Sequence, residues 1–169
     1  MKATRGFTLV ELLVTLMVVG ILLVVGVPSL ETLIKNNRLT AATNALATAL
    51  TLARSEAVRR GQTATLCVSS DLSSCAASST DWEDGWLVWS DANGDGVLDS
   101  AEIVSAQEAL PSNISVTATS GNIQFDGTGL LTSTPATFTL CDDRSGNYGR
   151  QLRVLAGGSV SLTTEVNCP

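Results

Sequence analysis

One segment of this 169-residue chain carries oxygen-bearing side chains at the spacing of a calcium-binding loop. Residues 91–102 match the EF-hand loop at each of its key positions. The six ligands would be Asp91, Asn93, Asp95, the carbonyl of Val97, Asp99 and a bidentate Glu102. Calcium takes six to eight oxygen ligands, and Gly96 stands where the loop turns sharply. These residues predict a structural calcium ion; nothing else in the sequence requires a cofactor.

A tight turn is the alternative explanation of the same residues. Asn93-Gly94 and Asp95-Gly96 are strong hairpin-turn signals. An EF-hand has a helix on each side of its loop, whereas Trp86-Leu87-Val88-Trp89 precedes this one and is typical of a strand. The preceding strand favours the hairpin turn. Because the ligand positions match, a calcium site stays the alternative interpretation.

The four cysteines of the chain offer disulfide chemistry. Their positions are Cys67, Cys75, Cys141 and Cys168. An even number of cysteines in a small exported domain predicts two disulfides formed in an oxidising compartment. Metal-thiolate binding is disfavoured because the chain has no CxxC pair and no histidine. Of the three possible connectivities, pairing of neighbours in sequence gives Cys67–Cys75 and Cys141–Cys168.

Glu11 is a carboxylate inside an otherwise apolar run, Phe7–Val27. An ionisable side chain in the middle of a membrane helix costs about 2.5–3.5 kcal/mol, so it normally has a partner. One possibility is that Glu11 reaches the nearby membrane surface, and its position alone favours this. The other is a partner in another chain, such as an N-terminal amine released by cleavage.

The sequence offers no catalytic constellation. It has no histidine to act as a base, no nucleophile elbow and no phosphate loop. The clustered carboxylates Asp81, Glu83 and Asp84 are explained by a solvated loop. An enzyme is therefore the least supported class of function.

The N-terminal part of the chain predicts a membrane anchor. Residues 1–6 form a short basic leader with Lys2 and Arg5, and residues 7–28 are long and apolar enough to span a bilayer. The leader cations predict a cytoplasmic N-terminus and an external remainder. Residues 29–60 are amphipathic, because apolar residues recur every three or four positions. Their stripe comprises Leu39, Ala42, Leu46, Leu50, Ala53 and Ala57.

The rest of the chain, residues 61–169, has the pattern of an antiparallel β-rich head. Short runs of Val, Thr and Leu alternate there with turn residues. The expected strands are Thr63–Ser69, Gly85–Ser90, Ile103–Ala106, Ser115–Thr119, Asn122–Phe125, Ala136–Cys141, Gln151–Leu155 and Val160–Thr163. One helix from about Phe7 to Arg60, with its second half packed on this head, gives an α+β fold.

The segment Gly6-Phe7-Thr8-Leu9-Val10-Glu11 resembles the class III signal of type IV pilins and type II secretion pseudopilins. The resemblance implies that a prepilin peptidase cuts between Gly6 and Phe7 and methylates Phe7. Glu11 then falls fifth in the mature chain, as the glutamate of the family does, which favours a role in assembly. Pro28 is similar to a proline late in the apolar half of pilins.

The head is similar to one subgroup, the GspH/FimT-type minor pilins. The similarity rests on Ala53-Arg54-Ser55-Glu56-Ala57, on Trp86-Leu87-Val88-Trp89 and on Phe138-Thr139-Leu140-Cys141-Asp142. It implies a structural subunit in the bacterial inner membrane, with the head in the periplasm, that joins other pilins and initiates a type IV pilus. The alternative is the equivalent pseudopilin of a type II secretion system.

DNA capture, which some relatives perform, is a third possibility that charge disfavours. The formal net charge is −6 and becomes −8 when cleavage removes Lys2 and Arg5. Residues 61–143 contain no Lys or Arg, and the cations of the head are Arg144, Arg150 and Arg153. Binding of phosphates needs a basic patch. These arginines are candidates for DNA or subunit contact, or for pairing with Asp142 or Asp143.

Overall fold

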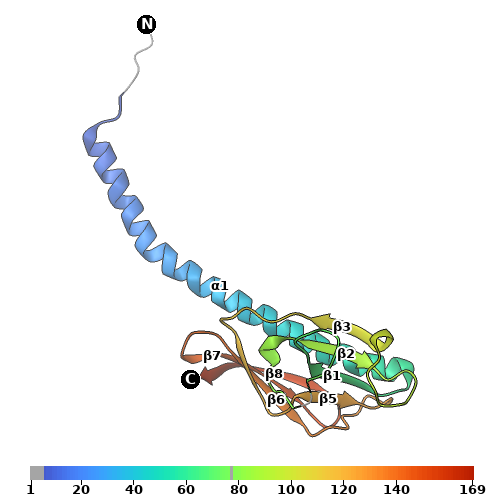
Figure 1. The fold of residues 1–169 in the computed structure, drawn as a ribbon. Coiled ribbons are helices and arrows are strands. Elements are labelled where there is room, and N and C mark those ends of the chain that lie inside the picture. The colour runs from blue at the N-terminus through green and yellow to red at the C-terminus, as the bar shows by residue number, and fades with distance from the viewer. Residues whose placement is uncertain (1–5, 77) are drawn as a thin grey trace. The chain divides into compact units, whose positions relative to one another are not determined.

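The fold is described from a computed structural model of the chain. The structure describes residues 6–76 and 78–169, except for the side chains at positions 25 and 28. It divides into two units, Met1–Asn37 and Arg38–Pro169, each described here by itself. Within the described residues a long helix, α1, precedes eight strands and two 3-10 turns (Figure 1).

Helix α1 runs from Leu9 to Arg60, close to the predicted bounds. It ends at Gly61, whose φ of 64° is in the left-handed region that glycine adopts without strain. In the second unit, every residue of the predicted apolar stripe from Leu39 to Ala57 is buried. The prediction that this half of the helix packs on the head is confirmed.

The head contains two antiparallel sheets of four strands each. Sheet A has the order β3 (Ile103–Gln107), β2 (Trp86–Ser90), β1 (Ala64–Val68) and β5 (Asn122–Phe125). Sheet B has the order β4 (Ser115–Ala118), β6 (Ala136–Cys141), β7 (Gly146–Val154) and β8 (Val160–Cys168). The short turns are η1 (Trp82–Asp84) and η2 (Ser100–Glu102). The α+β fold is confirmed. The division of the strands into two sheets was not predicted.

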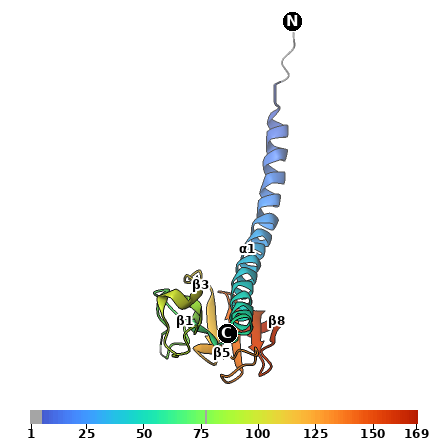
Figure 2. The same cartoon turned by 90° about the vertical axis from the view of Figure 1, so that its right-hand side faces the viewer.

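One hydrophobic core joins α1 to both sheets. Leu50 of α1 belongs to the same buried cluster as Leu66 of sheet A and Phe138 of sheet B. Figure 2 shows the second half of α1 with β1 and β3 on one side and β8 on the other. Trp82 of η1 is part of this core. Its ring centroid lies 5.0 Å from that of Phe138 in an edge-on arrangement, and its Nε1 donates a hydrogen bond to the carbonyl of Ser120.

The β7–β8 hairpin is longer than predicted. The expected strands were Gln151–Leu155 and Val160–Thr163, whereas β7 begins at Gly146 and β8 continues to Cys168. The ladder shifts register between Gly146 and Arg150, and Glu165 on β8 has a φ of 62°. Such a bulge inserts residues without ending the pairing, so the alternation that marks a strand in sequence is lost there.

We expect Leu50→Ala to destabilise the head by about 2–5 kcal/mol, because it leaves a cavity between α1 and the two sheets. Val58→Ala is the matched control on the same helix: Val58 is 53% exposed, and its truncation should change the stability by less than about 0.5 kcal/mol. Denaturant unfolding of the full chain in detergent measures both. Equal effects of the two variants would contradict the shared core.

Candidate functional sites

The first part of α1 exposes its apolar side chains. From Phe7 to Ile34, every residue whose burial is described is exposed, and most are large and apolar. By length and composition α1 could cross a membrane; no other helix in the described residues could. Apolar surface on this scale needs cover from lipid or from other apolar helices.

Glu11 closes a capping box at the start of α1. Its Oε2 accepts hydrogen bonds from the backbone N–H of Thr8 (3.1 Å) and the Thr8 hydroxyl (3.0 Å), while the Glu11 N–H donates to Thr8 Oγ1 (3.2 Å). This arrangement satisfies two donors that a helix start leaves free. Sequence analysis missed Thr8, although the Thr-x-x-Glu spacing is the signature of such a box. Neither bond to the carboxylate uses Oε1.

The predicted cleavage site precedes the helix. Gly6 and Phe7 are exposed and lie outside regular secondary structure. The rest of the predicted leader, residues 1–5, lies outside the described residues. Helix α1 includes position 28, but the Pro28 side chain is also outside them. The roles predicted for Gly6, Phe7, Glu11 and Pro28 therefore stay predictions.

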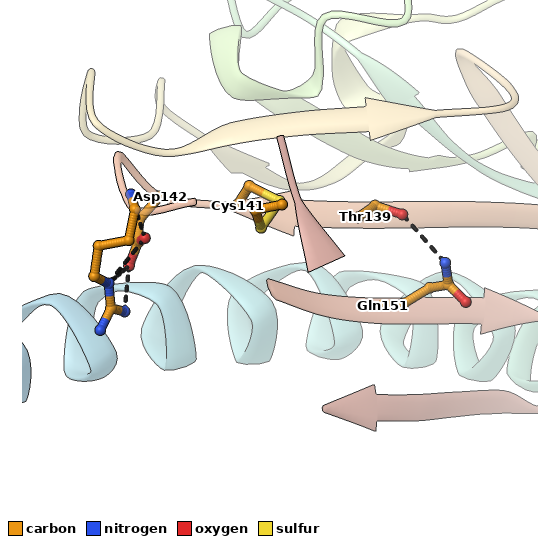
Figure 3. The surroundings of a disulfide bond; sticks show 6 residues. Thr139, Cys141, Asp142 and Gln151 are labelled. Carbon is orange, nitrogen blue, oxygen red and sulfur yellow. Dashed lines mark hydrogen bonds and ion pairs between the residues drawn. A yellow bond between two sulfur atoms is a disulfide. The ribbon is translucent and has the colours of Figure 1, made fainter. Parts of the chain in front are cut away.

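The two disulfides join neighbours in sequence, which is one of the three connectivities that the sequence allows. Cys67–Cys75 ties the loop after β1 to the outer side of sheet A, where Leu87 and Trp89 are buried beside it. Cys141–Cys168 ties the end of β6 to the end of β8 (Figure 3). Each bridge closes a loop of the chain covalently, which restricts the unfolded state.

Gly149 makes room for the second disulfide. A Cβ at this position would lie 2.7 Å from the Cys168 sulfur and 2.8 Å from the carbonyl of Val166. Both distances are shorter than a side chain tolerates, so position 149 of β7 must be glycine for the bridge to pack. Nothing in the sequence signals this requirement, because Cys168 approaches Gly149 only through the hairpin.

The candidate calcium residues lie in the connection between β2 and β3. Asp91 accepts bonds from the N–H groups of Gly94 (2.8 Å) and Gly96 (3.0 Å). Glu102 is buried, and its Oε1 accepts from the N–H groups of Ala92 (2.7 Å) and Asn93 (3.3 Å). β2 and β3 pair antiparallel, so the segment does serve as the loop of a hairpin.

In this geometry several loop oxygens accept hydrogen bonds from groups of the same loop. The Asn93 amide nitrogen faces the Asp95 and Asp99 carboxylates (3.0 and 3.4 Å). Over residues 6–76 and 78–169, no group of three or more His, Cys, Asp or Glu side chains is gathered so that it could hold a metal ion. The segment forms a hairpin turn, and calcium binding stays a prediction.

The three arginines of the head have different surroundings. Arg144 Nε donates to both carboxylate oxygens of Asp142 (3.1 and 3.0 Å), as Figure 3 shows, and its guanidinium lies 4.2 Å from the Tyr148 ring centroid. The hydrogen bond to Asp142 raises the pKa of Arg144. Arg150 Nη2 donates to Thr40 Oγ1 of α1 (3.1 Å), on the core side of β7. Arg153, three residues further on, is exposed on the opposite face.

Two family descriptions match the chain. Residues 42–158 match the family described as type II transport protein GspH. Residues 1–27 match the prokaryotic N-terminal methylation motif. No curated protein sequence matches the chain.

Solved structures with a similar fold include two bacterial proteins. The type IV minor pilin FimU of Pseudomonas aeruginosa has 24% identity and a TM-score of 0.60, over 79% of this chain and 93% of that one. The minor pseudopilin EpsH of the type 2 secretion system of Vibrio cholerae has 13% identity and a TM-score of 0.53, over 75% and 97%. At these identities the likeness shows the fold.

We expect calcium to raise the melting temperature of the full chain in detergent relative to chelator, if residues 91–102 bind it. At a free calcium concentration 100 times the Kd, the stabilisation would be about 2.7 kcal/mol. Glu102→Gln, which keeps an acceptor oxygen but removes the charge, should abolish the shift. Glu108→Gln, at an exposed carboxylate outside the loop, should keep it. Equal melting temperatures with calcium and chelator would leave the loop as a turn alone.

Proposed function

This chain belongs to the GspH family of pilin-like proteins, and from this premise we propose that it is a minor pilin of a type IV pilus. It is cut between Gly6 and Phe7, held in the inner membrane by the first part of α1, and assembled through that helix. Its head lies in the periplasm. The prepilin peptidase and the other pilins are its partners.

The observation that carries this proposal is the combination of the methylation motif with an uncovered apolar helix. The motif spans residues 1–27, and the described side chains from Phe7 to Ile34 are exposed. A bilayer covers such a helix before assembly, and the helices of neighbouring subunits cover it afterwards. A subunit that moves from one apolar surrounding to the other keeps its apolar surface covered throughout.

Glu11 supplies the polar contact of the assembly step. Cleavage would create an amine at Phe7, one residue before the capping Thr8. Among apolar helices a carboxylate and an amine stabilise each other strongly, because each alone would be an uncompensated charge. The capping box leaves Oε1 free of the two bonds from Thr8. Glu11 of one subunit can therefore hold its own helix start and accept from the amine of a neighbour.

A minor pseudopilin of a type II secretion system is the second candidate. The description of the matching family and the likeness to EpsH support it. The likeness to FimU, at higher identity and TM-score, supports the pilus. Neighbouring genes distinguish the two candidates. Genes for a pilus motor and a major pilin would indicate the pilus, and a secretion operon would indicate the pseudopilin. In either filament we place the subunit at the initiation of assembly.

DNA capture gains no support from the arginines. Arg144 is bound to Asp142, and strand alternation puts Arg150 and Arg153 on opposite faces of β7. A phosphate backbone needs several cations on one surface.

We expect the mature protein, purified from its native membrane, to lack Met1–Gly6 and to carry one added methyl group. Intact mass spectrometry measures both changes at once. The reason is the methylation motif at residues 1–27. A chain that keeps its leader would contradict the pilin mechanism and would leave a membrane-anchored β domain.

We expect Glu11→Gln to be cleaved normally but to enter filaments at least about a hundredfold less than the unsubstituted chain. The neutral amide leaves the neighbour's amine unpaired among apolar helices, and an uncompensated buried charge costs about 3–5 kcal/mol. The matched control is Glu31→Gln on the same helix, because Glu31 is exposed and its ion pair is with Lys35, one turn away on the same helix. Recovery of each variant in sheared filaments measures the effect. Normal incorporation of Glu11→Gln would refute the assembly role.

A further inference from the structure

The outer edge of sheet B, formed by β8, has no strand beside it. Within the described residues β8 pairs only with β7, in a regular ladder from Val154↔Val160 to Arg150↔Thr164. At the hairpin turn, the Leu155 N–H donates to the carbonyl of Ser159. Because antiparallel pairs alternate, the backbone N–H and C=O of Leu162 then point away from β7. They are free to pair with a further strand.

The other sheet edges are shorter or already occupied. The free side of β5 is covered by its own chain, since Thr132 N–H donates to the carbonyl of Gln124. β4 has four residues, and β3 has five with a register shift opposite β2. β8 has nine residues, and most of them are exposed. It is therefore the longest open edge of the head.

The apolar face of sheet B extends to Leu162, which the rest of the chain leaves partly exposed. Phe138, Leu152 and Leu162 form one row across β6, β7 and β8, with their side chains on the same face. Phe138 is 0% exposed and Leu152 is 1%, but Leu162 is 51% exposed. A further strand that placed an apolar side chain next to Leu162 would extend this row and bury it.

Charge indicates which strand fits. The free segment Val160–Thr164 contains no charged residue, so it lacks the edge lysines that usually prevent strand addition. Arg153 lies in the next strand, opposite Ser161 on the outer face, and is exposed. No ion pair in the described part of the chain involves it. If a further strand placed a carboxylate on that face, the carboxylate would interact favourably with the Arg153 guanidinium, although the head as a whole is acidic.

We propose that β8 is a docking edge, to which an extended acidic segment of another filament subunit adds as a strand. The segment places an apolar side chain against Leu162 and a carboxylate towards Arg153, while backbone hydrogen bonds supply the pairing. Glu165, at the bulge where the regular ladder ends, sets the limit of the paired length. The inference rests on the proposed function, because it takes its partner from the filament.

Photo-crosslinking of the full-length chain in its native membrane tests the proposal. The probe, benzoylphenylalanine, replaces Thr163, whose exposed side chain lies on the face opposite Leu162 and leaves that contact intact. We expect an adduct with another subunit that carries a pilin N-terminus, mapped by mass spectrometry to a segment containing Asp or Glu. An adduct with lipid only, with a second copy of this chain, or with no protein would overturn the inference.

Matched variants distinguish the loss of a contact at the β8 edge from a general loss of folding or cleavage. Leu162→Lys should lower the adduct yield about fivefold or more, whereas Leu130→Lys, at a leucine that is 50% exposed elsewhere in the head, should not. Arg153→Glu should lower the yield and Arg153→Lys should retain it. All four should keep the melting temperature and the cleavage at Gly6–Phe7. Absent cleavage would refute the proposed function, whereas normal cleavage with equal yields in all variants would refute the docking edge alone.

Discussion

The head depends on the burial of one helical stripe, from Leu39 to Ala57 of α1. The described strands form two open four-stranded sheets, and an open sheet of this size needs cover on its apolar face. The stripe supplies that cover to both, since Leu46 and Leu50 share a buried cluster with residues of sheets A and B. The second half of α1 is therefore part of the head's core, while the first part of the helix exposes apolar side chains that only lipid or other helices can cover.

A disulfide closes sheet B where β6 and β8 end. The regular β7–β8 ladder ends at Arg150↔Thr164, and beyond it the strands shift register before reaching Cys168. The disulfide from Cys141 to Cys168 fixes this irregular end, and Gly149 supplies the space for its sulfurs. An oxidising compartment is thus a condition of the fold as described, consistent with a head outside the cytoplasm.

The sequence predicted what depends on local pattern. Periodicity located α1 and its stripe, and alternation between turn residues located six of the eight strands closely. It could not predict the split into two sheets, because strand order depends on contacts such as Trp82 against Phe138 that no local pattern encodes. It shortened β7 and β8 because bulges break the alternation, and it missed Gly149 because its neighbour Cys168 is distant in sequence. Thr8 was recognisable from the Thr-x-x-Glu spacing that it forms with Glu11.

The placement of the cations limits which partners the acidic head can bind. Most arginines of the second unit are committed to its own structure: Arg54 to the carbonyls of Gly129 and Gly157, Arg59 and Arg60 to Glu56, Arg144 to Asp142, and Arg150 to Thr40. A polyanion such as DNA therefore meets carboxylates rather than a basic surface. The contacts proposed above instead use the apolar side chains of α1 and the open backbone of β8, to which Glu11 and Arg153 each add one charged group.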